Sequence, residues 1–280
     1  MAEFSGTTLN LIGYDLVPMT TAETTNDLVV PGFARNLAAV RYARNVVAIS
    51  EAAADEYRGW RTMLTGTGLP GPHIESAVLP TEAPTENPMA TDAARSRLRF
   101  GALPLVLVVG SHEPRKNHLA ILHAAELLWR EGHRFSLTFI GGNSWKSDAF
   151  TNTLARLQAA DRPVEAISAA TDELLWGGYR TARFTVFPSL NEGFGLPVAE
   201  SLACGTPVVT SNFGSMKEIA DAGGGALLVN PRDDHSITDG IRTLLTDGGL
   251  HAELAAQARS RPVRTWDTYA AETWEILTGD

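Results

Sequence analysis

From about residue 100 onward, short apolar runs alternate with longer segments of helical periodicity, and this alternation limits the folds open to the chain. The apolar runs are Leu105–Val109, Ser136–Ile140, Val164–Ser168, Phe184–Phe187, Pro207–Thr210 and Ala226–Val229. The helical segments are 117–131, 147–159, 171–180, 197–204, 215–220 and 234–246. Runs that are apolar on both sides suit strands buried between two layers of helices. Alternating strands and helices form right-handed βαβ units, so the sequence predicts an α/β protein with a doubly wound, Rossmann-like parallel sheet.

The first hundred residues carry fewer elements than a complete domain of this kind needs. The expected strands are Leu9–Ile12, Val46–Ser50 and His73–Leu79, and the expected helices are 33–43 and 51–63. We predict a partial, second Rossmann-like domain over 1–98 with a linker at about 80–98, a complete domain over 99–262, and a closing helix within 263–280 that packs back on the N-terminal part. An incomplete sheet leaves an unpaired edge and apolar surface exposed. Either the chain is therefore a fragment, or a second chain supplies the missing half.

Composition and charge argue against several classes of protein. The chain has 280 residues and a net charge of −9 without any basic stripe, which argues against nucleic acid as a partner. Its single cysteine, Cys204, cannot form an intrachain disulfide, which suits a reducing compartment. The N-terminus lacks the pattern of a signal peptide, and no apolar run approaches the ~20 residues of a membrane span. These features predict a soluble, cytoplasmic protein.

The segment from Phe187 to Glu200 has the pattern of a strand end, a glycine-containing loop and a helix that begins near Pro197. Proline suits the first turn of a helix. The loop brings backbone N–H groups and a helix N-terminus to the carboxyl edge of the sheet, where they favour an anion. Gly193 and Gly195 lack side chains where a ligand must approach the backbone. The segment predicts an anion site; the alternative is an ordinary strand-to-helix turn with a good cap.

Glu192 and Glu200 stand eight positions apart in this segment. Eight residues of helix span about 12 Å, whereas the acid and nucleophile of a retaining glycosidase lie roughly 5–5.5 Å apart. The two carboxylates therefore cannot share one glycosidic bond, but they can contact the two ends of one long ligand. The alternative is that both are surface carboxylates of a capped helix.

A second segment, Val109–Asn117, follows the first strand of the domain and faces the same edge of the sheet. Arg115 and Lys116 are adjacent cations beside a helix start, where the helix dipole disfavours positive charge, so they suggest a bound anion. At an effective dielectric constant of about 20, one such charge 4 Å from a phosphate contributes roughly 4 kcal/mol before desolvation. The alternative is a pair of solvated cations on a loop.

Four motifs in this order resemble the C-terminal domain of family 4 glycosyltransferases, over roughly residues 103–270. The motifs are Gly110 with Pro114-Arg115-Lys116-Asn117, Ile140-Gly141-Gly142, Pro188-Ser189 with Glu192-Gly193-Phe194-Gly195-Leu196-Pro197 and Glu200, and Gly205-Thr206-Pro207-Val208-Val209. The resemblance implies the GT-B type of fold, with two facing Rossmann-like domains, and sugar transfer from a nucleotide donor with retention. Upstream, Tyr14–Pro18, Val46–Ser50 and Val78–Pro80 are similar to the last third of the family's N-terminal domain.

The resemblance also implies roles for individual residues. Arg115 and Lys116 would bind the donor diphosphate, and Glu192 would contact the transferred sugar; these three form the predicted catalytic set. Glu200 would bind the ribose hydroxyls. The remaining donor-binding positions would be Gly110, Gly142, Gly193, Phe194, Gly195 and Leu196. No metal or other cofactor is expected, because cationic side chains and a helix N-terminus neutralise the leaving diphosphate.

On the acceptor side the resemblance points to Asp15. Many family members carry His-Asp where this chain has Tyr14-Asp15, which puts a histidine role near the donor sugar in doubt. The form Glu113–Asn117 resembles mannosyl- and rhamnosyl-transferring branches. The implied function is a retaining glycosyltransferase that acts on a saccharide or lipid-linked acceptor, in the cytoplasm or at the inner face of the membrane. A non-catalytic, sugar-nucleotide-binding regulatory subunit is the alternative, followed by an epimerase or phosphorylase on the same scaffold.

Three other features have plainer interpretations. Gly66–Gly71 matches a dinucleotide fingerprint but follows a helix and contains proline, so a loop is expected. His112 and His118 have no cysteine or carboxylate at ligand spacing, which argues against zinc. Cys204 is expected to be a small core residue rather than a nucleophile.

Overall fold

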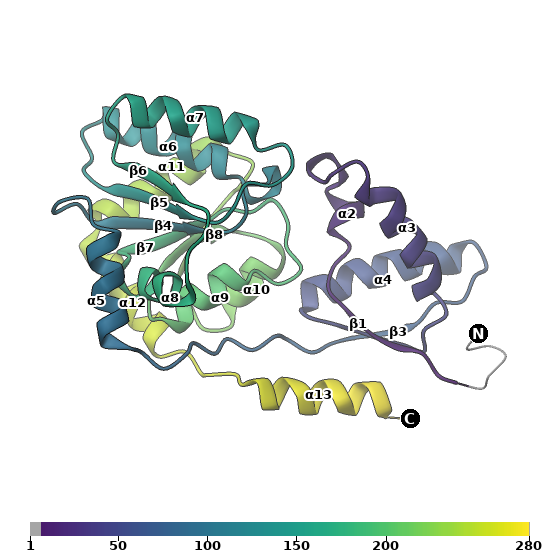
Figure 1. Ribbon diagram of the computed structural model, residues 1–280. Coiled ribbons are helices and arrows are strands. Elements are labelled where there is room, and N and C mark those ends of the chain that lie inside the picture. The colour runs from purple at the N-terminus through teal and green to yellow at the C-terminus, as the bar shows by residue number, and fades with distance from the viewer. Residues whose placement is uncertain (1–6, 280) are drawn as a thin grey trace. The chain divides into compact units, whose positions relative to one another are not determined.

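The computed structural model describes residues 7–279, and these form two units (Figure 1). Unit 1 comprises the chain up to Glu82, the short segment Asn191–Gly195, and the chain from Val263 onward. Unit 2 comprises Ala83–Leu190 and Leu196–Pro262. In the described part of the chain, no helix combines the length and apolarity that crossing a bilayer requires.

Unit 2 is built on a six-stranded parallel sheet. Its strands are β4 (Leu105–Val109), β5 (Ser136–Ile140), β6 (Val164–Ile167), β7 (Phe184–Phe187), β8 (Val208–Ser211) and β9 (Ala226–Val229). Across the sheet they run β6-β5-β4-β7-β8-β9, so the chain winds outward from β4 and then returns to β7 on its other side. This confirms the predicted doubly wound sheet. The order reverses between β4 and β7, and ligands of such sheets bind beside that reversal, at the carboxyl ends of the strands.

Helices cover both faces of this sheet (Figure 1). One face carries α6 (His118–Arg130), α7 (Asp148–Ala159) and α11 (Asp234–Thr246), and the other carries α8 (Asp172–Thr181), α9 (Leu196–Ala203) and α10 (Gly214–Asp221). The core on the first face includes Ile121, Leu128, Phe139, Phe150 and Ile237, all buried. Because both faces are covered, the strands are apolar almost throughout, which is the pattern that identifies them in the sequence.

One helix of unit 2 forms where the sequence predicted a linker over 80–98. Residues Pro88–Arg97 form α5, which packs against α8. Of its residues only Thr91 and Ala94 are buried, so its sequence lacks the apolar stripe that marks a helix. Gly177 permits the close approach, because a Cβ at that position would lie 2.4 Å from the Cβ of Ala94.

A second helix absent from the sequence prediction is α12 (Gly248–Arg259). It begins with two glycines, which disfavour helix. Its start is set instead by Asp247, whose carboxylate accepts a hydrogen bond of 2.9 Å from the backbone N–H of Leu250. A cap of this kind contributes about 1 kcal/mol to helix stability.

Unit 1 contains a three-stranded parallel sheet in the order β1-β2-β3. Its elements are β1 (Asn10–Gly13), α2 (Val17–Thr20), the 3-10 turn η1 (Ala22–Thr24), α3 (Val29–Val40), β2 (Asn45–Ala48), α4 (Glu51–Gly66), β3 (His73–Ser76) and α13 (Trp266–Thr278). Helix α13 packs against β2, where Val47, Ala77 and Tyr269 form a small buried cluster. The C-terminal segment is thereby joined to the first strands of the chain.

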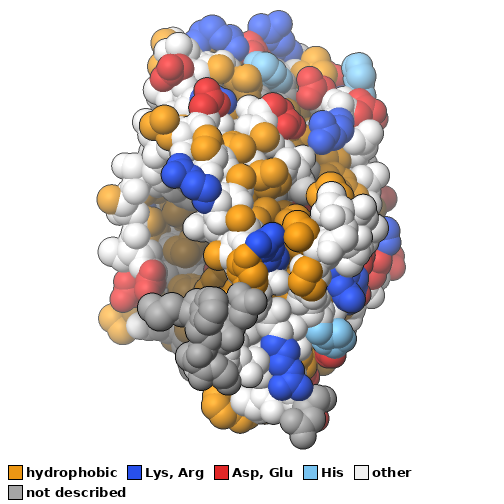
Figure 2. Space-filling view, turned by 90° about the vertical axis from the view of Figure 1, so that its right-hand side faces the viewer, with side chains coloured by type: hydrophobic (Ala, Val, Ile, Leu, Met, Phe, Trp, Pro, Cys, Tyr) orange, Lys and Arg blue, Asp and Glu red, His pale blue; other side chains and the backbone are white. Residues whose placement is uncertain are grey.

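Strand β1 forms an edge of this sheet, because within residues 7–279 it pairs only with β2. Ile12 on this strand is 44 % exposed, and the adjoining Leu9 is 37 % exposed. Figure 2 shows a face of the molecule on which hydrophobic side chains gather across the middle. An exposed parallel edge with apolar residues beside it is a surface that another strand can cover.

Candidate functional site

The two motif segments of unit 2 lie against each other at the reversal of the sheet. The loop after β4 carries Arg115, and the chain leaving β7 contains Ser189 and Leu190. The backbone carbonyl of Arg115 accepts hydrogen bonds from the Ser189 hydroxyl (3.0 Å) and from the Leu190 N–H (2.9 Å). Asn117 donates to the Pro188 carbonyl at 3.3 Å. The cationic segment is therefore held at the carboxyl edge, beside the strand that leads to the glycine-containing loop.

Lys116 extends over an apolar support. Its ammonium nitrogen lies 4.9 Å from the centre of the Phe187 ring, a cation–π contact. Its Cδ and Cε atoms would lie 3.7 Å from a Cβ placed on Gly110, so the missing side chain at Gly110 leaves room for the lysine stem. Gly110 also has φ +138, which a residue with a side chain rarely adopts. The predicted donor-binding residue Gly110 thus has a structural use in placing Lys116.

Arg115 has an acidic partner close by in its own loop. Its guanidinium lies 2.8 Å from the carboxylate of Glu113, and the two side chains are only 14 % and 5 % exposed. Sequence reasoning treated Arg115 and Lys116 as two equivalent cations at one loop. In the structure Glu113 neutralises part of the charge of Arg115 and orients its guanidinium.

The glycine turn after β5 adjoins the loop after β4, but its two glycines are placed differently. A Cβ on Gly141 would lie 1.9 Å from the carbonyl oxygen of Gly110, so the two turns touch through their backbones. Gly142 has nothing within 4 Å of an added Cβ. Gly141 is therefore required for packing, whereas Gly142, the predicted donor-binding residue, borders open space.

Glu200, on α9, has a buried partner that sequence reasoning missed. The hydroxyl of Tyr179, a fully buried side chain of α8, donates to Glu200 Oε2 at 2.6 Å. Burial raises the pKa of Glu200 above its ordinary value of 4.5, although the hydrogen bond from Tyr179 opposes that shift. One carboxylate oxygen is fixed by the tyrosine, and this sets the direction of the other.

Cys204, one turn beyond Glu200, behaves as a core residue. Burial raises the pKa of its thiol to about 11, so the thiol stays protonated at neutral pH. A protonated, half-buried thiol is a poor nucleophile. This agrees with the expectation from the sequence.

Replacing Glu200 with glutamine is expected to leave the stability of the protein undiminished at neutral pH. A folded-state pKa above the unfolded value means that the carboxyl stabilises the fold below about pH 4.5, and that this contribution is lost as pH rises through the folded pKa. Glu200→Gln should therefore leave the unfolding free energy at pH 7.5 equal to or above that of the wild type, with the advantage shrinking toward pH 5. Urea denaturation at both pH values measures this effect. A loss of more than about 1 kcal/mol at pH 7.5 would contradict it.

The predicted residues of the glycine-containing loop belong to unit 1. The side-chain amide of Asn191 donates to Glu56 Oε1 at 2.7 Å and to the Thr20 hydroxyl at 3.0 Å. The Ser50 hydroxyl donates to the Gly193 carbonyl at 2.5 Å. These contacts seat the loop on α2 and on the start of α4.

Gly193 and Asp15, both predicted site residues, are in contact within unit 1. A Cβ on Gly193 would lie 2.7 Å from the Tyr14 carbonyl oxygen and 2.9 Å from Asp15 Oδ2, so only glycine fits there. Asp15 also accepts a hydrogen bond from Val17 N at 3.1 Å, which starts α2. Glu192 is half-buried beside Gly193.

The remaining predicted positions complete the loop. Phe194 is 3 % exposed and Gly195 has φ +105, a conformation that favours glycine. Leu196, the first residue of α9 in unit 2, is 49 % exposed. Each unit therefore holds its own share of the predicted residues: Gly110, Arg115, Lys116, Gly142, Leu196 and Glu200 in unit 2, and Asp15, Glu192, Gly193, Phe194 and Gly195 in unit 1.

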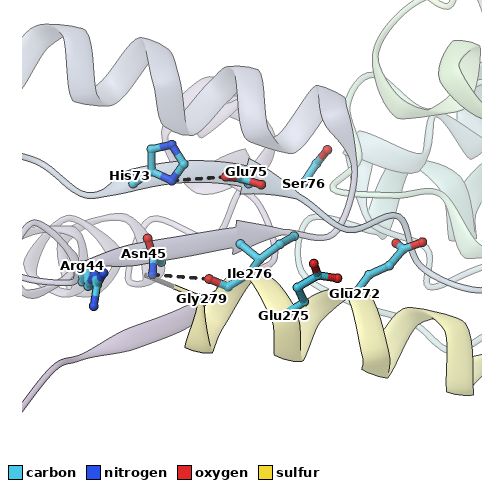
Figure 3. Close-up of a pocket in the computed structure, with 9 residues that line it drawn as sticks. All are labelled: Arg44, Asn45, His73, Glu75, Ser76, Glu272, Glu275, Ile276 and Gly279. Atoms are coloured by element: carbon cyan, nitrogen blue, oxygen red, sulfur yellow. Dashed lines mark hydrogen bonds and ion pairs between the residues drawn. The ribbon is translucent and has the colours of Figure 1, made fainter.

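A hollow of about 750 Å³ lies elsewhere in unit 1, between β3 and α13 (Figure 3). Arg44 and three glutamates, Glu75, Glu272 and Glu275, are among the residues that line it. His73 lies 3.5 Å from Glu75, as the dashed line marks. None of the predicted site residues lines this hollow, so we exclude it from the candidate site.

Nothing in the described residues groups three or more histidine, cysteine, aspartate or glutamate side chains in a way that could hold a metal ion. Lys116 and Arg115 provide positive charge on the loop after β4, at the carboxyl edge of the sheet. The arrangement can bind an oxyanion through cationic side chains and backbone amides.

Comparison with known proteins gives a family and several relatives. A family model described as "Glycosyl transferases group 1" matches residues 91–261, more than half of the chain. The serotype-specific mannosyltransferase WbdA of Escherichia coli is 29 % identical over 189 residues, which are 64 % of this chain and 23 % of that protein. A D-inositol 3-phosphate glycosyltransferase of Acidothermus cellulolyticus is 38 % identical over 189 residues, 63 % of this chain and 42 % of that protein. The chain spans less than half the length of these curated relatives.

Solved structures extend the likeness to both units. An α,α-trehalose-phosphate synthase (UDP-forming) from Burkholderia xenovorans, in complex with glucose-6-phosphate, superposes with a TM-score of 0.72 at 15 % identity, covering 99 % of this chain and 70 % of that one. Sucrose-phosphate synthase from Thermosynechococcus elongatus gives 0.68 at 23 % identity, covering 85 % and 59 %. At these identities the likeness shows the fold alone, and it is the GT-B type of fold that the motifs imply.

Proposed function

We infer the function of this chain from its family, since it belongs to the glycosyl transferases group 1 family, and we propose the details of the reaction from its site. The proposed reaction moves a sugar from a nucleoside-diphosphate donor to a saccharide or glycoconjugate acceptor, with retention of configuration. The proposed donor site of unit 2 is formed by Arg115, Lys116 and Glu200.

The observation that carries this proposal is the position of Lys116 at the carboxyl edge of the sheet. Its stem lies over Gly110 and its ammonium over Phe187, while the neighbouring Arg115 carbonyl is tied to the chain leaving β7. A leaving nucleoside diphosphate develops negative charge on its phosphate oxygens. A cation held at that edge, with backbone amides at the start of α9 as its proposed partners, would stabilise the charge without rearrangement.

Retention is proposed to proceed by attack of the acceptor on the same face as the leaving diphosphate. The departing phosphate would help to remove the acceptor proton. Glu192 is proposed to bind the transferred sugar, and we do not assign it as a nucleophile. No metal is proposed, because Lys116 and Arg115 supply the positive charge.

A mannose- or rhamnose-type donor is the proposed specificity. The form Glu113–Asn117 supports this proposal, since it resembles mannosyl- and rhamnosyl-transferring branches. The relatives give further support: an O-antigen chain mannosyltransferase B of Escherichia coli is 33 % identical over 170 residues, 60 % of this chain and 44 % of that protein. The acceptor is proposed to be a saccharide or a lipid-linked glycan.

Incubation with GDP-, UDP- and dTDP-sugars and a panel of saccharide acceptors tests the proposal. We expect release of nucleoside diphosphate with GDP-mannose or dTDP-rhamnose, and a product whose anomeric configuration matches the donor by NMR. Release with inversion, or from no donor in the panel, would contradict the proposal.

A second candidate function follows from the exposed edge of β1, because Ile12 and the edge backbone suit a further parallel strand. If acceptor binding requires a strand that pairs with this edge, this chain by itself is a sugar-nucleotide-binding subunit, and the partner that supplies the strand completes the enzyme. In that case donor binding is observed by calorimetry without turnover, and turnover appears when the completing part is added.

A further inference from the structure

Two buried imidazoles bracket the cationic segment of unit 2. His112 precedes and His118 follows the residues Glu113–Asn117, and the two Nδ1 atoms lie 3.0 Å apart. Both side chains are buried, with exposures of 4 % and 2 %. Their hydrogen bond joins the two ends of the segment that carries Arg115 and Lys116, so the segment is closed into a short loop.

The rings sit among aromatic side chains. His112 stacks on Phe150 with centroids 4.2 Å apart and an interplanar angle of 25°, and His118 lies 5.3 Å from the Phe139 ring. Within the described residues, Nε2 of His118 has no hydrogen-bond partner. Burial lowers the pKa of both imidazoles, and the nearby charge of Lys116 lowers the pKa of His118 further. Both rings are therefore neutral at physiological pH.

In a neutral pair of imidazoles one Nδ1 carries a proton and the other accepts it, so the 3.0 Å contact is a hydrogen bond in either assignment of the proton. The backbone N–H of His112 also donates to the Gly142 carbonyl at 2.9 Å. The pair therefore links three segments: the start of α6, the loop after β4 and the glycine turn after β5.

Hydrophobic side chains would fill this pocket at lower cost, because a polar ring buried with one unsatisfied nitrogen is destabilising. The imidazoles, however, form a directional hydrogen bond, which hydrophobic side chains cannot form. Two short turns shape the loop from within, from Lys116 N to the Glu113 carbonyl at 3.1 Å and from Asn117 N to the Pro114 carbonyl at 3.0 Å. The Arg115 carbonyl is held from outside by the Ser189 hydroxyl, and the histidine pair adds a contact that joins the two ends of the loop. Asn117 also adopts a left-handed conformation with φ +60.

We propose that His112 and His118 are positioning residues, whose mutual hydrogen bond holds the loop so that Lys116 is directed at the donor diphosphate. The inference rests on the proposed function and deepens it, because it assigns the shape of the diphosphate site to a pair of side chains that do not touch the ligand. Because the histidine pair acts through Lys116, its positioning role can be tested separately from the role of Lys116 in binding the diphosphate.

The test compares two replacements of His118 of different chemistry. In His118→Asn the side-chain amide takes the place of Nδ1 and can still form a hydrogen bond with His112 Nδ1, whereas His118→Leu fills the space without a hydrogen-bonding group. The probes are inorganic pyrophosphate and the nucleoside diphosphate with the highest affinity among GDP, UDP and dTDP, with its parent nucleoside as the control ligand, all measured by calorimetry. We expect His118→Leu to weaken pyrophosphate and nucleoside-diphosphate binding about tenfold and to leave nucleoside binding unchanged. His118→Asn should restore affinity to within about threefold of the wild type.

Measuring His118→Leu in a protein that also carries Lys116→Ala distinguishes a positioning role from a general loss of structure. If the pair acts through Lys116, His118→Leu has little further effect on pyrophosphate binding in that background. If His118→Leu does not fold, as judged by circular dichroism and thermal unfolding, His112→Asn and His112→Leu make the same comparison from the other residue of the pair.

The outcomes distinguish this inference from the proposed function. Wild-type pyrophosphate affinity in folded His118→Leu and His112→Leu, together with weakened binding in Lys116→Ala, overturns the positioning role and leaves the donor site standing. An equal loss for the nucleoside and the diphosphate also overturns it, because the effect would then be structural. Unchanged diphosphate binding in Lys116→Ala overturns the proposed donor site and this inference together.

Discussion

Lys116→Ala is expected to lower kcat by roughly 10²–10³ and to weaken nucleoside-diphosphate binding by about 1.5–3 kcal/mol. The larger effect on turnover follows because charge on the leaving diphosphate is greatest in the transition state. Arg115 cannot replace the lost charge, since its guanidinium is already committed in part to Glu113 at 2.8 Å. Steady-state kinetics with the active donor, and calorimetry with its nucleoside diphosphate, measure the two quantities.

Arg130→Ala is the matched control for this substitution. Arg130 is the last residue of α6, the helix that begins two residues after Lys116, and its side chain is 66 % exposed in an ion pair with Glu126. Thirteen residues of helix place it about 20 Å from the site. Its removal changes net charge by the same unit and should alter kcat and affinity less than twofold. Equal effects of the two variants would mean that Lys116 acts only through long-range charge, and would count against the donor site.

The parts of unit 2 that were predictable from the sequence are those in which local pattern and tertiary burial agree. Strands β4 and β7 are apolar runs because helices cover them on both sides, and the motifs that follow them must meet where the strand order reverses. This is why the loop carrying Lys116 and the chain leaving β7 could be assigned to one edge before any coordinates. Helix α5 was not predicted, because it contacts α8 through Thr91 and Ala94 rather than through an apolar stripe.

The contacts that orient the site residues could not be predicted, because they join positions with no fixed spacing. Tyr179 and Glu200 lie on different helices, and only the packing of α8 beside α9 brings the hydroxyl to the carboxylate. His112 and His118 were recognised as a poor metal site, but their mutual contact depends on the loop conformation around Asn117. Sequence patterns predict which loops share an edge of the sheet more readily than which side chains hold those loops in place.

Gly141→Ala is expected to destabilise the protein by at least about 3 kcal/mol. The added Cβ would lie 1.9 Å from the carbonyl oxygen of Gly110, and a backbone atom cannot move aside as the end of a flexible side chain can. The residue also has φ +156, which side-chain-bearing residues rarely adopt. The shift would reach Lys116, because Gly110 supports the stem of that lysine. Unfolding free energies from urea denaturation measure the effect.

Gly142→Ala provides the control from the adjacent position. Nothing lies within 4 Å of a Cβ there, so its unfolding free energy should stay within about 0.5 kcal/mol of the wild type. If the donor approaches the backbone at Gly142 as proposed, this variant should nevertheless bind nucleoside diphosphate more weakly. If Gly141→Ala loses stability while Gly142→Ala loses only affinity for the nucleoside diphosphate, the first glycine serves packing and the second serves the approach of the ligand. A Gly141→Ala variant as stable as the wild type would contradict the contact between the two turns, and with it the support assigned to Lys116.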